Sequence, residues 1–193
     1  MLGLKLATDP RWVNIVEKDI AEILTDHAWC EQKAASTAIS LTVQFHDYPE
    51  LVDAMIELAR EELLHFKMVT DKLNERGLKL GRERKDNYVN ELLGFVRKGV
   101  DRKIVLIDKL LFSAMIEARS CERFRLLSEN ISDEDLKIFY RELMASEAGH
   151  YKLFISFARK YTERDLVDKR WEEFLEYEAG IISNYGKAAG MHA

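Results

Sequence analysis

The chain has 193 residues, of which 47% are hydrophobic and 33% charged, and its formal net charge is −5 at pH 7. This length suits one domain, residues 1–193, with a sizeable core, and the negative balance gives no overall sign of a nucleic-acid-binding protein. No apolar run approaches the roughly 20 residues of a membrane-spanning helix and no signal-peptide pattern opens the chain, so we expect a cytoplasmic protein without a membrane partner.

Helices are predicted along almost the whole chain, because only 2 prolines and 9 glycines interrupt it. In chain order, apolar periodicity and breakers predict a short helix near 12–16 and further helices over about 19–45, 49–76, 88–96, 103–129, 132–161 and from 162 onward. Ser132 is the predicted N-cap of the fourth long helix. The tail from Gly186 is expected to be loose.

Two of these helices carry the same short motif, Glu-x-x-His. Glu62 and His65 form one copy and Glu147 and His150 the other, at an offset of 147 − 62 = 85 residues. Residues three apart lie on one face of a helix, so each motif presents a carboxylate beside an imidazole. In both copies an aromatic residue, a lysine and an apolar residue follow the histidine, which indicates an internal repeat.

A lone glutamate on each of the other two long helices extends the repeat. Glu31 and Glu117 are 117 − 31 = 86 residues apart. Glu31 precedes Glu62 by 62 − 31 = 31 residues and Glu117 precedes Glu147 by 147 − 117 = 30 residues, spacings that fit an antiparallel hairpin of two long helices. One Glu on two helices and Glu-x-x-His on the other two is the ligand pattern of ferritin-like dinuclear carboxylate proteins. The predicted fold is therefore all-α, a ferritin-like four-helix bundle with a long crossover between two hairpins and extra short and terminal helices.

Glu122 is a rival ligand on the third long helix. It lies about 140° from Glu117, on a face with Arg125 and Glu129, and it breaks the 86-residue offset, so we prefer Glu117. The remaining histidines have no counterpart in the repeat and are not predicted as ligands: His27, His46 and His192.

The chemistry of the six residues indicates two divalent metal ions. Their four carboxylates carry four negative charges, which two divalent cations neutralise. Oxygen and nitrogen ligands without thiolates suit iron or manganese and argue against structural zinc, and the residue types alone leave the choice between iron and manganese open. Each histidine needs a hydrogen-bond partner on its second nitrogen; Glu61 is the candidate for His65, and Ser146 holds the equivalent place in the repeat.

The crossover, residues 76–103, breaks the acidic pattern with nine basic and four acidic residues. A positive segment of this kind suits an anionic polynucleotide, although an ordinary solvated loop explains it equally well. Seven of its basic residues are candidate contacts to such a polynucleotide: Arg82, Arg84, Lys85, Arg97, Lys98, Arg102 and Lys103.

Four stretches resemble one family. Residues 27–36 (HAWCEQKAAS), 61–66 (EELLHF), 117–124 (EARSCERF) and 146–151 (SEAGHY) are similar to the bacterial tRNA 2-methylthio-N6-isopentenyladenosine hydroxylases. The resemblance implies a non-haem di-iron monooxygenase with the same six metal ligands. It further implies dioxygen as co-substrate, an external electron donor, and hydroxylation of the isopentenyl side chain of a modified adenosine beside the anticodon of tRNA.

Three other functions remain open on the residues themselves. A ferritin-like iron oxidase would store iron in a large cage, a dimanganese catalase or another di-iron oxygenase would act on a small substrate, and a metal-free bundle would have no such chemistry. The electron-transfer partner and the oligomeric state, a monomer or a small oligomer, are not defined by the sequence.

Overall fold

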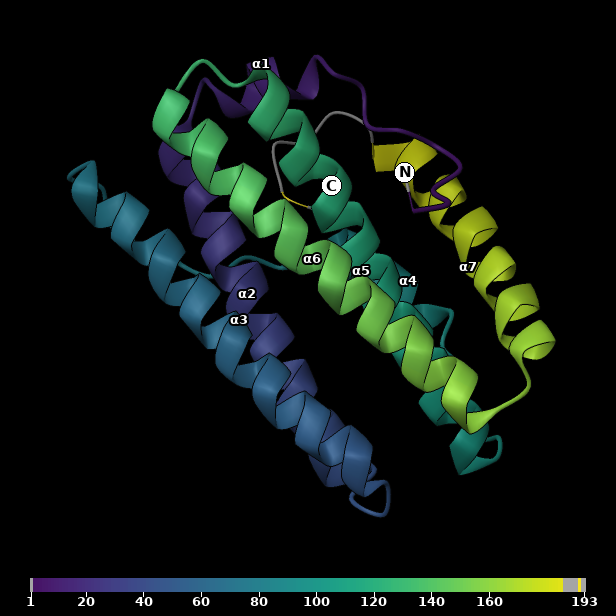
Figure 1. Ribbon diagram of the computed structural model, residues 1–193. Coiled ribbons are helices and arrows are strands. Elements are labelled where there is room, and N and C mark those ends of the chain that lie inside the picture. The colour runs from purple at the N-terminus through teal and green to yellow at the C-terminus, as the bar shows by residue number, and fades with distance from the viewer. Residues whose placement is uncertain (1, 186–190, 192–193) are drawn as a thin grey trace. The chain divides into compact units, whose positions relative to one another are not determined.

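The computed structural model describes residues 2–185 and 191, and in this part of the chain it has seven helices and no strand (Figure 1). In chain order these are α1 (Trp12–Val16), α2 (Ile20–Gln44), α3 (Pro49–Glu75), α4 (Asn87–Gly94), α5 (Arg102–Asn130), α6 (Glu134–Tyr161) and α7 (Arg164–Tyr185). Over the described residues, no helix combines the length and the apolarity that crossing a bilayer requires. The helices predicted from the sequence are confirmed to within a few residues at their ends; the tail from Gly186, like His192, lies outside the described residues.

The described residues fall into two compact units, which are treated separately below. The α2–α3 unit comprises residues 18–85 and Met191, and the α5–α6 unit comprises residues 2–17 and 86–185. The expectation of a single domain over 1–193 stays a prediction.

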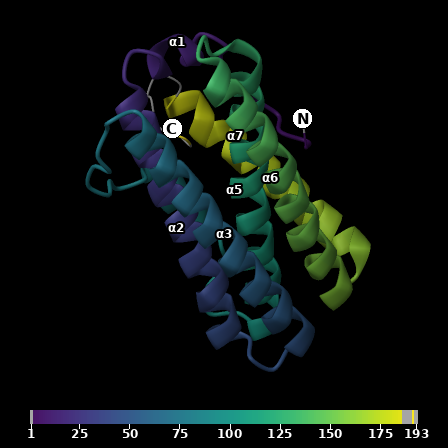
Figure 2. The same cartoon turned by 60° about the vertical axis from the view of Figure 1, so that its left-hand side comes forward.

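The α2–α3 unit is a hairpin whose two long helices lie side by side in both views (Figures 1 and 2). The Asp19 side chain accepts a hydrogen bond from the Glu22 backbone N–H and so begins α2, and Pro49 occupies the first turn of α3. Gly77, at φ +66°, ends α3 in a conformation that favours glycine. The loop after it returns to α2, where the Trp29 indole donates to the Gly81 carbonyl at 3.0 Å.

The α5–α6 unit is organised around α5, which is buried on nearly every side. Helix α6 packs along α5 in both views, and α1, α4 and α7 also contact α5 (Figures 1 and 2). Because neighbouring helices cover α5 from several directions, its sequence shows no clear division into a polar and an apolar face.

The predicted N-cap of α6 was wrong by one residue. The Asp133 carboxylate accepts from the Leu136 backbone N–H at 3.1 Å and caps the helix. Ser132 instead donates its backbone N–H to the Glu17 carboxylate at 2.6 Å. A tertiary contact to a residue 115 positions earlier therefore decides where the helix begins, and no local pattern could reveal it.

Candidate metal centre

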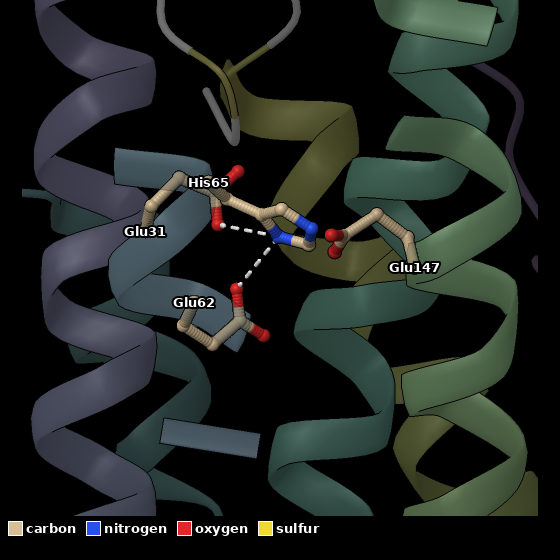
Figure 3. A group of neighbouring side chains, drawn as sticks. All are labelled: Glu31, Glu62, His65 and Glu147. Atoms are coloured by element: carbon tan, nitrogen blue, oxygen red, sulfur yellow. Dashed lines mark hydrogen bonds and ion pairs between the residues drawn. The ribbon is translucent and has the colours of Figure 1, made fainter. Parts of the chain in front are cut away.

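Three predicted ligands gather in the α2–α3 unit. Glu31 on α2 and Glu62 and His65 on α3 are each at most 5% exposed, and each offers a ligand atom within 4.8 Å of the others. The His65 Nδ1 atom lies 3.2 Å from Glu62 Oε2 and 3.9 Å from Glu31 Oε2. Figure 3 shows both carboxylates turned toward this imidazole.

His27 belongs to the same cluster, although the sequence did not point to it. Its ring is fully buried on α2, and its Nε2 atom lies 2.6 Å from Glu31 Oε1. One oxygen of Glu31 is therefore engaged by His27 while the other faces His65. The signal that could have revealed this contact is the i, i+4 spacing of His27 and Glu31; His27 was not predicted as a ligand because it has no counterpart in the repeat.

The other three predicted ligands gather in the α5–α6 unit. Glu117 on α5 and Glu147 and His150 on α6 are each at most 5% exposed, and their ligand atoms also lie within 4.8 Å of one another. The His150 Nδ1 atom lies 3.8 Å from Glu147 Oε1. Each unit thus brings together two carboxylates and one imidazole from two adjacent helices.

The two histidines have matching surroundings. In both motifs Nδ1 faces the glutamate three residues earlier, and Nε2 faces the side chain four residues earlier. That side chain is Glu61 in one unit, at 3.9 Å, and Ser146 in the other, at 3.5 Å. Both distances are long for hydrogen bonds, so the supporting role of Glu61 stays a prediction.

Glu122, the rival of Glu117, has other partners. Its two carboxylate oxygens accept from the Thr8 backbone N–H at 2.9 Å, from the Thr8 hydroxyl at 2.7 Å and from Arg119 at 2.9 Å. Glu122 is 2% exposed, whereas its predicted face-mates Arg125 and Glu129 are partly exposed. The reason is that the segment before α1 covers Glu122, a contact across 114 residues.

Glu122 is part of a buried charged network that the sequence did not reveal. Arg119 is fully buried and donates two hydrogen bonds to Glu178 on α7, at 2.9 and 2.7 Å. Burial raises the pKa of Glu178 despite the opposing effect of Arg119, and burial also raises the pKa of Tyr88, whose hydroxyl donates to Glu178 at 3.2 Å. The network joins α4, α5 and α7 and the N-terminal segment, so its evident role is structural.

The seven predicted tRNA contacts fall in both units, and all are exposed. Arg84 is paired with Glu22 within the α2–α3 unit, so its charge is offset locally. In the α5–α6 unit Arg97 is held by Asp108, 2.7 Å from its carboxylate. Lys98 and Lys103 have no acidic partner in the part of the chain that the structure describes.

The donors of each unit fit a hard or borderline metal ion. Two buried carboxylates within 4.8 Å of each other repel by roughly 3 kcal/mol at an effective dielectric of 20, and a bound cation removes this cost. Carboxylate oxygens with imidazole nitrogens suit iron and manganese, and neither group of candidate ligands contains a cysteine.

Comparison with known proteins adds a family to this geometry. The family model of tRNA-(MS[2]IO[6]A)-hydroxylase (MiaE) matches residues 2–193. A tRNA 2-(methylsulfanyl)-N(6)-isopentenyladenosine(37) hydroxylase of Pseudomonas putida is 39% identical over 186 residues, covering 96% of this chain and 89% of that protein. The protein of the same name from Salmonella typhimurium is 31% identical over 218 residues, covering 89% of this chain and 79% of that protein.

A solved structure gives the fold. It is a protein with aldehyde deformylating oxygenase activity from Synechococcus, with a TM-score of 0.91 and 33% identity over 98% of this chain and 95% of that one. The all-α, ferritin-like fold predicted from the sequence is confirmed.

Proposed function

The chain belongs to the MiaE family of tRNA hydroxylases, and from this premise we propose that its two groups of candidate ligands, one half-site in each unit, bind the two metal ions of an oxygen-dependent monooxygenase. The resemblance found in the sequence is thus confirmed, and the enzyme is a dioxygen-dependent tRNA hydroxylase. The readings as an iron-storage protein or a dimanganese catalase are not favoured.

The proposed reaction is hydroxylation of the isopentenyl side chain of 2-methylthio-N6-isopentenyladenosine, the nucleoside next to the anticodon. One atom of dioxygen enters a C–H bond of the side chain and the other leaves as water, which consumes two electrons and two protons. An electron-transfer partner would supply these electrons. We place the reaction in the cytoplasm, where tRNA is modified, and expect a monomer or small oligomer.

The observation that carries the proposal is the same ligand set on two hairpins. The six proposed ligands are Glu31, Glu62, His65, Glu117, Glu147 and His150, all buried. Their four negative charges match two divalent iron ions, and the ligand pattern is that of ferritin-like di-iron proteins. When bound, such a pair would supply the activation of dioxygen.

The chain's own residues would prepare the site in three ways. The two carboxylates of each half would bind metal, and the imidazoles would fill the nitrogen positions. His27, 2.6 Å from Glu31, would fix the orientation of that carboxylate. Burial of all six side chains would exclude bulk water, which strengthens the electrostatic interactions there.

The direct test is incubation of iron-loaded protein with tRNA that carries the unhydroxylated nucleoside, a reductant and oxygen labelled with the heavy isotope. Nucleoside mass spectrometry should show one added oxygen atom that carries the label. The Glu62→Ala variant is the control and should give no product. Unchanged tRNA together with conversion of an aldehyde, the activity named for the Synechococcus protein, would overturn the assignment. A cage-sized assembly in size-exclusion chromatography would instead favour iron storage.

A further inference from the structure

We propose that a pocket between the start of α5 and α7 binds a nucleotide of the tRNA other than the one that is hydroxylated. This α5–α7 pocket lies wholly in the α5–α6 unit and has a volume of about 290 Å³. The inference rests on the proposed function, because it assumes that tRNA is the substrate. It adds a site on α7, a helix to which the sequence assigned no tRNA contact.

One wall of the pocket is apolar and open to solvent. Leu166 on α7 is 57% exposed and Ile104 on α5 is 37% exposed, while Ile107 is buried. Two exposed branched side chains that line a pocket are costly in water, and contact with a planar base or a ribose would cover them. The volume is at the lower end of the roughly 300–1,000 Å³ of small-molecule sites, which suits a single nucleotide unit.

The arginine wall consists of two lining residues that the protein holds in position. Arg97 and Arg170 both donate to Asp108, which is fully buried, at distances from 2.7 to 3.0 Å. Burial alone would raise the pKa of Asp108, but the hydrogen bonds from the two arginines outweigh it and the pKa is lowered. The carboxylate is therefore ionised and anchors both guanidinium groups.

Arg170 is further immobilised by aromatic and backbone contacts. Its guanidinium lies 4.2 Å from the ring centroid of Phe95 and 4.9 Å from that of Phe174, and it donates to the Phe95 carbonyl at 2.8 Å. A side chain already held in one conformation loses little entropy when a ligand arrives. The arginine wall is thus preorganised for an anion.

Lys169 supplies the charge that nothing in the described chain compensates. The lining groups include three cations, Arg97, Lys169 and Arg170, and one carboxylate, Glu173, which is paired with Arg170 at 2.8 Å. Lys169 is exposed and has no acidic partner within residues 2–185 or at 191. Even with Asp108 counted, the cluster keeps one net positive charge, and Lys98 and Lys103 lie beside lining residues in the chain.

This arrangement fits a polyanion better than a free anion. A single phosphate could be held by Lys169 alone, but the apolar wall and the flanking lysines offer contacts to a base and to neighbouring phosphates. RNA-binding sites combine such apolar platforms with cations that follow the backbone. By contrast, Arg84 in the first half of the crossover is already paired with Glu22.

The test compares Lys169→Glu with Arg141→Glu by measuring tRNA affinity over a range of salt concentrations. Arg141, on α6, is also exposed and has no acidic partner among the described residues, but it does not line the pocket. Lys169→Glu should weaken binding by about fivefold or more and reduce the salt slope by about 0.7 to 0.9 log units per log unit of salt. Arg141→Glu should match the unaltered protein more closely on both measures.

Leu166→Ser examines the apolar wall separately. Because Leu166 is largely exposed, the change should not unfold the protein, and tRNA affinity should fall roughly threefold to tenfold with the salt slope unchanged. If Lys169→Glu behaves like Arg141→Glu while both still hydroxylate tRNA, the pocket is not a tRNA site and the proposed function stands. If the unaltered, iron-loaded protein neither binds nor hydroxylates tRNA, the proposed function itself fails.

Discussion

Exchanging Glu117 and Glu122 for alanine, one at a time, should separate metal binding from stability. Both glutamates are on α5 and both are buried, at 5% and 2% exposure. Glu117 lies with Glu147 and His150, whereas Glu122 is bonded to Thr8 and Arg119. We therefore expect opposite effects: Glu117→Ala loses iron and keeps its stability, and Glu122→Ala loses stability and keeps its iron.

The magnitude follows from the partners that each change leaves behind. Removing one member of a buried ion pair costs about 3–5 kcal/mol. Arg119 would keep Glu178 and the Leu6 carbonyl, so about 3 kcal/mol is expected for Glu122→Ala. For a chain of 193 residues this lowers the melting temperature by about 6–12 °C. Glu117→Ala instead removes a repelling carboxylate from the metal-free protein, so its stability should be unchanged or slightly higher.

The assay is denaturant unfolding of the metal-free proteins together with the iron content of the loaded ones. Glu129→Ala is the control, because Glu129 is on the same helix and, among the described residues, forms only an exposed pair with Arg125 at 3.4 Å. It should change the unfolding free energy by less than about 0.5 kcal/mol. Normal stability with lost iron in Glu122→Ala, and full iron in Glu117→Ala, would show that Glu122 is the ligand and that the repeat was misread.

Four further predictions concern the same protein. The active form should contain about two irons per chain, and Glu62→Ala should remove at least one and abolish hydroxylation, as metal analysis of both proteins would show. His27→Ala should lower iron affinity about 10- to 100-fold in a chelator competition, because Glu31 loses its partner, while the exposed His46→Ala should not. Burial raises the pKa of Cys121 to about 11, so in metal-free protein at pH 8 a thiol reagent should label the partly buried Cys30 faster than Cys121, which should react only on unfolding. The triple variant Arg82→Glu, Arg84→Glu and Lys85→Glu reverses the charge of the first half of the crossover, and it should weaken tRNA binding and flatten its salt dependence without loss of iron. Undiminished tRNA binding would show that this segment is an ordinary solvated surface.

The helices were predictable because each is specified locally. Asp19 caps α2, Pro49 begins α3 and Gly77 ends it, and each feature is visible in a few consecutive residues. The one misplaced boundary, at Ser132, depends on Glu17, a residue from another part of the chain. Local signals thus predicted the elements, and errors arose where a distant partner decided the outcome.

The candidate ligands were predictable for a different reason, namely the repeat. The two helical hairpins carry the same motif, with Glu62 and Glu147 at equivalent positions, so each copy supports the prediction that the other binds metal. His27 has no equivalent in the second hairpin, and its contact with Glu31 was therefore overlooked although the spacing is local. The repeat therefore identifies the ligands that the two hairpins have in common, but it gives no information on a residue such as His27 that occurs in only one of them.

Charge is where the linear sequence is least informative, because the net charge of a segment is not the charge of a surface. Arg84 and Arg97 contribute equally to the net charge of the crossover. In the structure, however, Arg84 is paired with Glu22 within its own unit. Arg97 shares the buried Asp108 with Arg170, which lies 62 residues after Asp108 and is also paired with Glu173, so two carboxylates balance the two arginines. Lys169 then adds an unopposed charge from α7, outside the segment that the composition marked. A phosphate is attracted by cations that have no acidic partner in the folded structure. Lys169 is such a cation within the described residues, and the α5–α7 pocket is therefore the site to test first.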